Sequence, residues 1–448
     1  MTVANEYDVL HTEAKGIFFS ALKACDIASS VDRRIRFEGN LLHQLEAGGS
    51  GRSTIDLNDF EEVFVIALGK AAGPMTDTLL SRMPRRAGLR GIYCSNQPPT
   101  QKDENFQYFE GGHPVPNEDS FAAARAALAL LKTAGKSTLV FFLISGGGSA
   151  MFELPIDPKT TLPETIAFYE LLLGSGAPID EVNTLRKHFS AVKGGRLAMA
   201  APDSTKVNLL VPDVPLQSLD ALASGPTCPN RSTITDVRGL LDRYALGIKL
   251  PESMRRFLEE DSLANADTEA FRNSWFEVLL SSEDLVANAR AFADRAGYYV
   301  VVDNSCDDWP YEQAAHYLLE RFHALRRRHP RTCLISVGEV TVALNDRPGA
   351  GGRNQQFVLQ CAIELDQYPG ERLTVLSAGS DGIDGNTNAA GAVADVATAT
   401  RARAVGYNPE IALATFDAYP LFAALGDLVL TTPTGQNLRD LRLLIGES

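Results

Sequence analysis

The sequence lacks the usual markers of secretion, membrane insertion and structural metal. Its six cysteines are scattered and form no CxxC pair, which is typical of free thiols in a reducing compartment. No apolar run approaches the roughly 20 residues that a membrane span needs. The first ten residues carry acids where a signal peptide has a basic and then an apolar region. These absences predict a soluble, cytoplasmic protein without a membrane partner.

The common cofactor and hydrolase motifs are also missing. No GxGxxG follows a strand, so a dinucleotide-binding fold of that kind has no support. The tetrapeptide Gly135-Lys136-Ser137-Thr138 resembles the end of a Walker A loop, but it precedes a strand, and Leu130 stands where that loop has its first glycine. HExxH and GxSxG are absent, which removes the zinc-protease and α/β-hydrolase signatures.

Positive charge is scarce. The chain has 42 Lys and Arg against 56 Asp and Glu, a net charge of −14, which argues against nucleic acid or an anionic membrane as partner. An anionic substrate therefore requires a local cluster of basic residues. The length of 448 residues suggests two or three domains.

One glycine-rich stretch stands out against this background. Residues 138–144 are apolar, β-branched and aromatic, which predicts a buried strand, and Ser145-Gly146-Gly147-Gly148-Ser149 follows at once. Backbone N–H groups that no side chain covers suit phosphate oxygens. A tight turn in which glycine supplies a positive φ is the alternative interpretation.

Buried strands alternate with helices along most of the chain, which predicts an α/β protein of two domains. We expect a doubly wound domain over residues 1–245 and a smaller α/β domain over 246–448, with segment 405–448 as a candidate to return to the first. Ligands of doubly wound sheets bind at the carboxyl ends of the strands. Lys70, Ser145–Ser149 and Asp213 all follow predicted strands.

Several basic residues are candidates for anion binding. Lys70 adds a positive charge at a predicted helix N-terminus, and Arg186 and Lys193 are seven residues apart, so they share a face if the helix is continuous. Arg353 follows Gly351-Gly352 at a predicted helix start, where it could stabilise a transferring phosphoryl group. His113 is a candidate acid, base or substrate contact. Each could instead be an ordinary surface residue.

Carboxylates at predicted strand ends suggest a metal. Asp381 and Asp384 lie in a glycine-containing loop, and with Asp213 they suit a Mg²⁺ ion that keeps several waters. A glycine-aspartate turn is the alternative for the loop. Phosphoryl transfer needs a backbone loop that binds phosphate, nearby positive charges and Mg²⁺, and the candidates above could supply all three.

Taken in order, the motifs resemble the MOFRL-type (class II) glycerate 2-kinases. The stretches that carry the resemblance are Ala67–Ala72, Gly112–Pro116, Ile144–Ala150, Asn183–His188, Lys193–Leu197, Ala223–Thr227, Gly351–Gln355, Asp381–Gly385 and Ala389–Ala392. The resemblance implies ATP- and Mg²⁺-dependent phosphorylation of D-glycerate to 2-phosphoglycerate. It also implies a larger Rossmann-like domain, a smaller domain with a mixed sheet, and an active site in the cleft between them.

The resemblance implies catalytic roles for Lys70 and Arg353. Our hypothesis from the residues is that Ser145–Ser149 hold nucleotide phosphates and that Asp213, Asp381 and Asp384 place the metal. The expected substrate residues are His113, Asn183, Arg186 and Lys193. The sequence departs from the family at Gln217, Gln356, Ser380 and Asn388, where Asp, an acidic residue, Thr and Asp are more usual. A hydroxypyruvate reductase and a non-catalytic binding protein remain alternatives, and a homodimer is possible.

Overall fold

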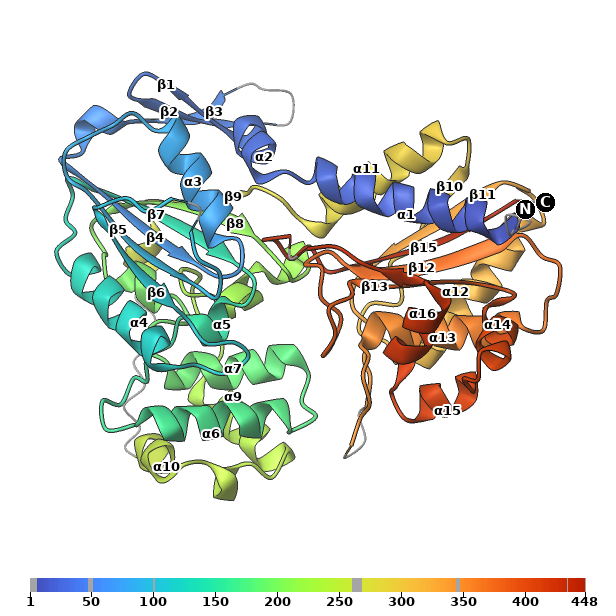
Figure 1. Ribbon diagram of the computed structural model, residues 1–448. Coiled ribbons are helices and arrows are strands. Elements are labelled where there is room, and N and C mark those ends of the chain that lie inside the picture. Colours follow the sequence, from blue (N-terminus) through green and yellow to red (C-terminus); the bar gives the residue numbers. More distant parts are fainter. Residues whose placement is uncertain are drawn as a thin grey trace. The chain divides into compact units, whose positions relative to one another are not determined.

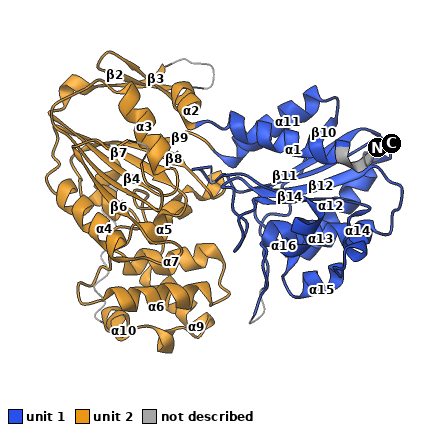
Figure 2. Ribbon diagram, viewed as in Figure 1, with its two compact units in different colours: residues 1–26, 281–448 blue, residues 27–280 orange. Residues whose placement is uncertain are grey.

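A computed structural model describes residues 6–46, 51–99, 101–259, 268–343, 347–432 and 434–447 (Figure 1). The chain divides into two compact units (Figure 2). The central unit contains residues 27–280, and the terminal unit contains residues 1–26 together with 281–448. No described helix is long and apolar enough to cross a membrane.

These boundaries differ from the expected division at residue 245. Helix α1 (Glu6–Ala24) packs against α11 (Ser282–Arg295), β12 (Leu373–Gly379) and β15 (Asp440–Gly446), so it belongs with the C-terminal part of the chain. Strand β9 (Ser274–Val278) completes the sheet of the central unit. Segment 405–448 does not return to the first domain, because β15 lies inside the sheet of the terminal unit.

The central unit is built on a parallel six-stranded sheet in the order β6-β5-β4-β7-β8-β9. The strands are β4 (Glu62–Leu68), β5 (Leu89–Ser95), β6 (Phe106–Glu110), β7 (Thr138–Ser145), β8 (Thr205–Val211) and β9. The chain builds outward from β4 through β5 and β6, then returns to the other side of β4 with β7. This is the doubly wound arrangement that the sequence predicted, and its direction reverses between β4 and β7.

Helices cover this sheet, and some lie beyond it. They are α3 (Ala72–Arg82), α4 (Glu118–Leu131), α5 (Gly148–Met151), α6 (Leu162–Leu173), α7 (Ile179–Phe189), α8 (Arg196–Met199), α9 (Ile234–Arg243) and α10 (Glu252–Glu259). Asn117 and Thr161 cap α4 and α6 through their side chains. Short 3₁₀ segments span Leu57–Asp59, Leu216–Ser224, Gly247–Lys249 and Thr268–Phe271. Helix α2 (Ile27–Arg34) leads into a small antiparallel sheet of β1 (Ile35–Glu38), β2 (Leu41–Leu45) and β3 (Gly51–Asp56).

The terminal unit has a mixed six-stranded sheet, as expected. Its order is β10 (Tyr299–Val302), β11 (Thr332–Val337), β15, β12, β13 (Gly391–Asp395) and β14 (Leu428–Val429), with β10 and β11 parallel and the other neighbours antiparallel. Helices α1 and α11 cover one face (Figure 1). The other face packs on α12 (Tyr311–Arg326), α13 (Arg353–Leu365), α14 (Thr398–Ala404), α15 (Pro409–Ala414) and α16 (Ala418–Leu425).

Candidate functional site

The loops after β4 and β7 are joined at the point where the strand order reverses. The N–H of Lys70 donates to the carbonyl of Gly146 at 2.9 Å, and the N–H of Ala71 donates to Ser145 Oγ at 3.0 Å. Ser145 Oγ in turn donates to the carbonyl of Leu68 at 3.2 Å. The Ser145 hydroxyl therefore links two strands, which does not support its predicted role in holding phosphate.

The first two loop glycines bring three predicted side chains together. A Cβ on Gly146 would lie 2.2 Å from Asp213 Oδ2. Gly147 has a φ of 80°, and a Cβ there would lie 3.3 Å from Lys70 Cγ and 3.4 Å from His113 Cδ2. Lys70, His113 and Asp213 thus converge on the glycine loop, in which Gly146 and Gly148 are buried and Gly147 is partly exposed.

The end of the loop is held by a chain of hydroxyl groups. Ser149 Oγ lies 2.8 Å from Ser224 Oγ, and Ser224 Oγ donates to Asn183 Oδ1 at 2.9 Å. Because the proton of Ser224 points to Asn183, Ser149 is the donor to Ser224. Ser224 is fully buried in a left-handed conformation with a φ of 59°. Ser224 lies in Ala223–Thr227, one of the stretches that carry the family resemblance, but it was not predicted as a site residue.

Lys193 forms a buried ion pair instead of facing a substrate. Helix α7 ends at Phe189, so Lys193 does not share its face with Arg186. Lys193 Nζ lies 2.6 Å from Glu153 Oε2, and the side chain is 1% exposed. Burial lowers the pKa of Lys193, whereas Glu153 opposes that shift. The structure therefore does not support the prediction that Lys193 holds a substrate carboxylate.

Arg186 is a buried cation near the same loop. Its guanidinium lies 4.6 Å from the centre of the Tyr169 ring, and among the described residues its Nε has no hydrogen-bond partner. The Tyr169 hydroxyl lies 2.6 Å from the carbonyl oxygen of Ser149 and 2.5 Å from Glu153 Oε2. Arg186 thus remains a candidate for binding an anion, and Tyr169 fixes the loop beside it.

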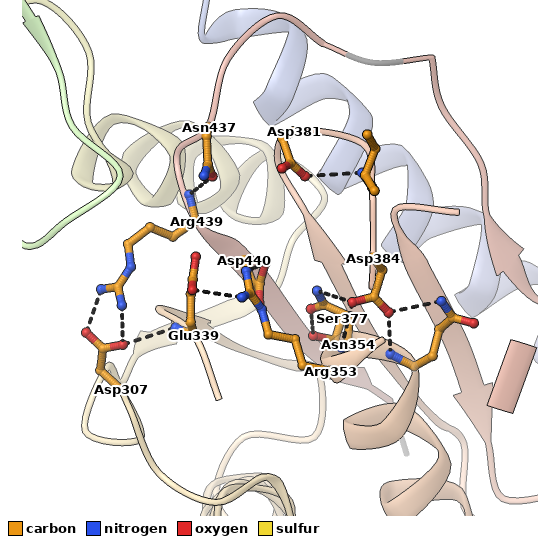
Figure 3. Close-up of polar contacts among 12 residues, drawn as sticks. Asp307, Glu339, Arg353, Asn354, Ser377, Asp381, Asp384, Asn437, Arg439 and Asp440 are labelled. Atoms are coloured by element: carbon orange, nitrogen blue, oxygen red, sulfur yellow. Dashed lines mark hydrogen bonds and ion pairs between the residues drawn. The ribbon is translucent and has the colours of Figure 1, made fainter. Parts of the chain in front are cut away.

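In the terminal unit, Arg353 begins α13 and pairs with two carboxylates (Figure 3). Its Nε lies 2.5 Å from Asp440 Oδ2, and one terminal nitrogen lies 2.8 Å from Glu339 Oε2. Burial opposes the charge, but Asp440 and Glu339 raise the pKa of Arg353 above its ordinary value. Because the side chain is 37% exposed, this permanent cation can also reach a ligand. Neither carboxylate was predicted, although Asp440 opens an otherwise largely apolar strand.

Asp384 caps α13 and is not placed as a metal ligand (Figure 3). Its two oxygens accept from the backbone and side-chain nitrogens of Asn354 and Gln355, at 2.9–3.2 Å. It is 1% exposed. Burial and the neighbouring Asp440 raise its pKa to about 6, whereas the N–H donors favour the ionised form. With four donors on two oxygens, the prediction that Asp384 binds Mg²⁺ is not supported.

The remaining carboxylates fit a metal that is held in part by other ligands. Asp381 Oδ1 accepts from the N–H of Ile383 at 3.1 Å, and Asp213 lies beside Gly146 in the other unit. Over the described part of the chain, no three His, Cys, Asp or Glu side chains are grouped so that they could hold an ion. Mg²⁺ is commonly bound by one or two carboxylates together with water and substrate phosphates. Asp213 and Asp381 each fit that kind of site.

Three of the four residues that depart from the family pattern make hydrogen bonds within the terminal unit. Gln356 donates to the carbonyl of Leu413 at 3.0 Å, and Ser380 Oγ accepts from the N–H of Leu438 at 2.6 Å; both residues are buried. Asn388 Oδ1 accepts from the hydroxyl of Tyr419 at 2.8 Å. These polar side chains stabilise the terminal unit. Nothing in the structure explains Gln217.

A doubly wound unit with glycines and a lysine at its strand ends, and a second α/β unit with a charged arginine at a helix start, are typical of an enzyme that transfers phosphoryl groups. Comparisons with known proteins agree with this class. Residues 13–259 match a domain of unknown function, DUF4147, and residues 332–440 match the MOFRL family.

Individual relatives identify the family more narrowly. The D-glycerate 2-kinase of Thermotoga maritima is 33% identical over 401 residues, which cover 87% of this chain and 92% of that protein. A putative hydroxypyruvate reductase of Agrobacterium vitis is 36% identical over 85% of this chain and 87% of its own. The crystal structure of glycerate kinase from Thermotoga maritima has a TM-score of 0.78 and 29% identity, and covers 98% of this chain and 100% of that one. The chain belongs to the MOFRL-type glycerate 2-kinase family.

Proposed function

We propose that this protein is a glycerate 2-kinase. It transfers the γ-phosphoryl group of ATP to the 2-hydroxyl of D-glycerate and gives 2-phospho-D-glycerate. The observation that carries the proposal is the convergence of Lys70, His113 and Asp213 on the glycine loop at the reversal of the sheet. Membership of a family with glycerate kinases in bacteria, archaea and mammals supports the same reaction.

In the central unit, the backbone of Gly146, Gly147 and Gly148 holds phosphate oxygens. Lys70 places its positive charge on the same group, because its side chain lies against Gly147. Arg186 and Asn183 bind the carboxylate and hydroxyl groups of the glycerate. The buried Arg186 suits a carboxylate, because an anion supplies the acceptor that its Nε lacks among the described residues. His113 contacts the substrate from the loop before α4.

In the terminal unit, Arg353 neutralises charge that develops on the moving phosphoryl group. Its helix-start position and its permanent charge suit this role. We propose Mg²⁺ as the divalent metal, with Asp213 and Asp381 as candidate ligands. When bound, it neutralises part of the negative charge on the nucleotide phosphates. The protein contributes positioning and electrostatic stabilisation, and no covalent intermediate is required.

The test is an assay of the purified protein with ATP, Mg²⁺ and D-glycerate that measures ADP release, with the product identified by phosphorus NMR. Phosphate on C2 supports the proposal, and phosphate on C3 or no turnover contradicts it. Removal of divalent metal with a chelator is expected to abolish turnover, and added Mg²⁺ to restore it. Lys70→Ala and Arg353→Ala should each lower kcat by roughly 10²-fold or more. Lys136→Ala, which changes an exposed lysine in the tetrapeptide that resembles a Walker A loop, is the matched control and should retain activity.

The relative from Agrobacterium vitis raises a second candidate, reduction of hydroxypyruvate. The chain has no GxGxxG after β4 or any other described strand, which counts against a nicotinamide cofactor of the usual kind. Oxidation of NADH or NADPH in the presence of hydroxypyruvate would favour this candidate. Kinase turnover would exclude a protein that merely binds nucleotide.

A further inference from the structure

Arg442 is a wholly buried cation in the middle of the terminal unit's sheet. It lies on β15, between β11 and β12, in register with Ser336 and Ser377. Its side chain is 0% exposed, and its guanidinium lies 5.6 Å from the centre of the Phe357 ring. Among the described residues, Nε and both terminal nitrogens have no hydrogen-bond partner. Burying a charge in this way is costly, so the position calls for a compensating role.

The nearest explanation lies two residues earlier on the same face of the strand. Asp440 is also buried, and both of its oxygens accept hydrogen bonds from Arg353. Although burial alone would raise the pKa of Asp440, Arg353 and then Arg442 hold it below the ordinary value. Arg442 thus acts on Asp440 through space, whereas Arg353 contacts it directly.

The charges around Arg353 show what Arg442 contributes. Arg353 pairs directly with two carboxylates, Asp440 and Glu339, and the buried Asp384 is a third carboxylate close enough to act on it. The adjacent Arg439 pairs with Asp307 and also attracts Glu339, so the carboxylates in this group still outnumber the two arginines (Figure 3). A guanidinium with two carboxylate partners is a poor site for a further anion, because the local field is negative. Arg442 adds a positive charge from inside the sheet.

We propose that Arg442 is a positioning residue that balances the charge of Asp440, so that Arg353 remains an effective cation toward the phosphoryl group. The inference rests on the proposed role of Arg353 and deepens it. Arg442 touches no substrate, because it has no exposed surface. A packing role against Phe357 is the competing explanation.

Charge compensation separates these explanations. Arg442→Met keeps the length of the side chain and removes its charge, so kcat should fall roughly tenfold, which is less than the 10²–10³ typical of losing a direct donor. Glu339→Gln in the same background removes one of the two carboxylates on Arg353 and should restore most of the lost kcat. Arg442→Lys keeps the charge and should remain within about threefold of wild type. Arg326→Met is the control, because Arg326 lies near the far end of β15, on Glu371 and the carbonyl of Glu447.

Rescue of kcat by Glu339→Gln is the decisive result. If Arg442 only packed against Phe357, removing the charge of Glu339 could not restore the kcat lost in Arg442→Met. An unchanged kcat in Arg442→Met, or no rescue in the double variant, overturns the proposal. Arg442→Gln is the second neutral variant if Arg442→Met does not fold. A neutral variant that folds only with Glu339→Gln supports the charge balance, and failure to fold in both backgrounds overturns it. If the wild type has no kinase activity, the proposed function fails, and coupling of the two positions in urea unfolding still tests Arg442.

Discussion

Replacing Gly147 by alanine tests the glycine loop with one added carbon. Gly147 has a φ of 80°. The new Cβ would lie 3.0 Å from Met151 Cε, 3.3 Å from Lys70 Cγ and 3.4 Å from His113 Cδ2. The substitution thus combines backbone strain with pressure on two proposed site residues.

The structure allows the size of the backbone strain and of the new contacts to be estimated. A left-handed conformation costs an alanine roughly 1–2 kcal/mol, so the free energy of unfolding should fall by about that amount. The contacts require the neighbours to move by a few tenths of an ångström. Since a misplacement of about 1 Å can cost ~10²-fold in rate, we expect kcat/KM to fall roughly three- to tenfold.

Gly176 provides the matched control. Its φ is 72°, close to that of Gly147, but nothing lies within 4 Å of the Cβ that an alanine would add. Gly176→Ala should therefore lose a similar free energy of unfolding in urea and keep its kcat/KM for D-glycerate and ATP. If both variants have equal activity, the loop does not hold the reacting groups. If Gly147→Ala alone loses activity, strain is excluded as the cause.

Three further substitutions test other assignments. Asp384→Ala removes the cap of α13 and should lower the free energy of unfolding by about 2–3 kcal/mol in urea, while the Mg²⁺ concentration for half-maximal rate stays the same; a shifted Mg²⁺ requirement would restore the metal assignment. Lys193→Met strands the Glu153 carboxylate and should cost about 3–5 kcal/mol, most of which returns on adding Glu153→Gln; no recovery would contradict the ion pair. Burial lowers the pKa of His188 from 6.5 to about 4. The unfolded chain therefore binds the extra proton first, and stability should fall as pH drops from 6.5 to 4, less steeply in His188→Gln. Equal slopes in both proteins would argue against a neutral buried His188.

Patterns local to the strands were enough to predict β4, β7 and β8 of the central sheet and the residues at their ends. The strands β4, β7 and β8 are buried along almost their whole length, so their apolar runs are unambiguous. Parallel strands end at one edge, which is why Lys70, the glycine loop and Asp213 could be placed together. The motifs, taken together and in order, then indicated the family.

Partners distant in the sequence were not predictable in the same way. Lys193 and Asp384 are residue types expected in an active site. In the structure, however, Lys193 pairs with Glu153, and Asp384 accepts hydrogen bonds from the start of α13. A sequence pattern gives the charge of a side chain and not the group that neutralises it. The position of α1 was missed for a related reason, because an amphipathic helix shows that it covers a sheet without showing which one.

The crossing of α1 into the terminal unit has a consequence for synthesis on the ribosome. Residues 27–280 form one uninterrupted unit, which can fold as soon as they emerge. The other unit has α1 on the N-terminal side of these residues and its central strand, β15, on their C-terminal side. Helix α1 must therefore wait, with its apolar face uncovered, until α11, β12 and β15 have been made. A chain released before β15 is made would have a folded central unit and a terminal unit whose sheet lacks its middle strand.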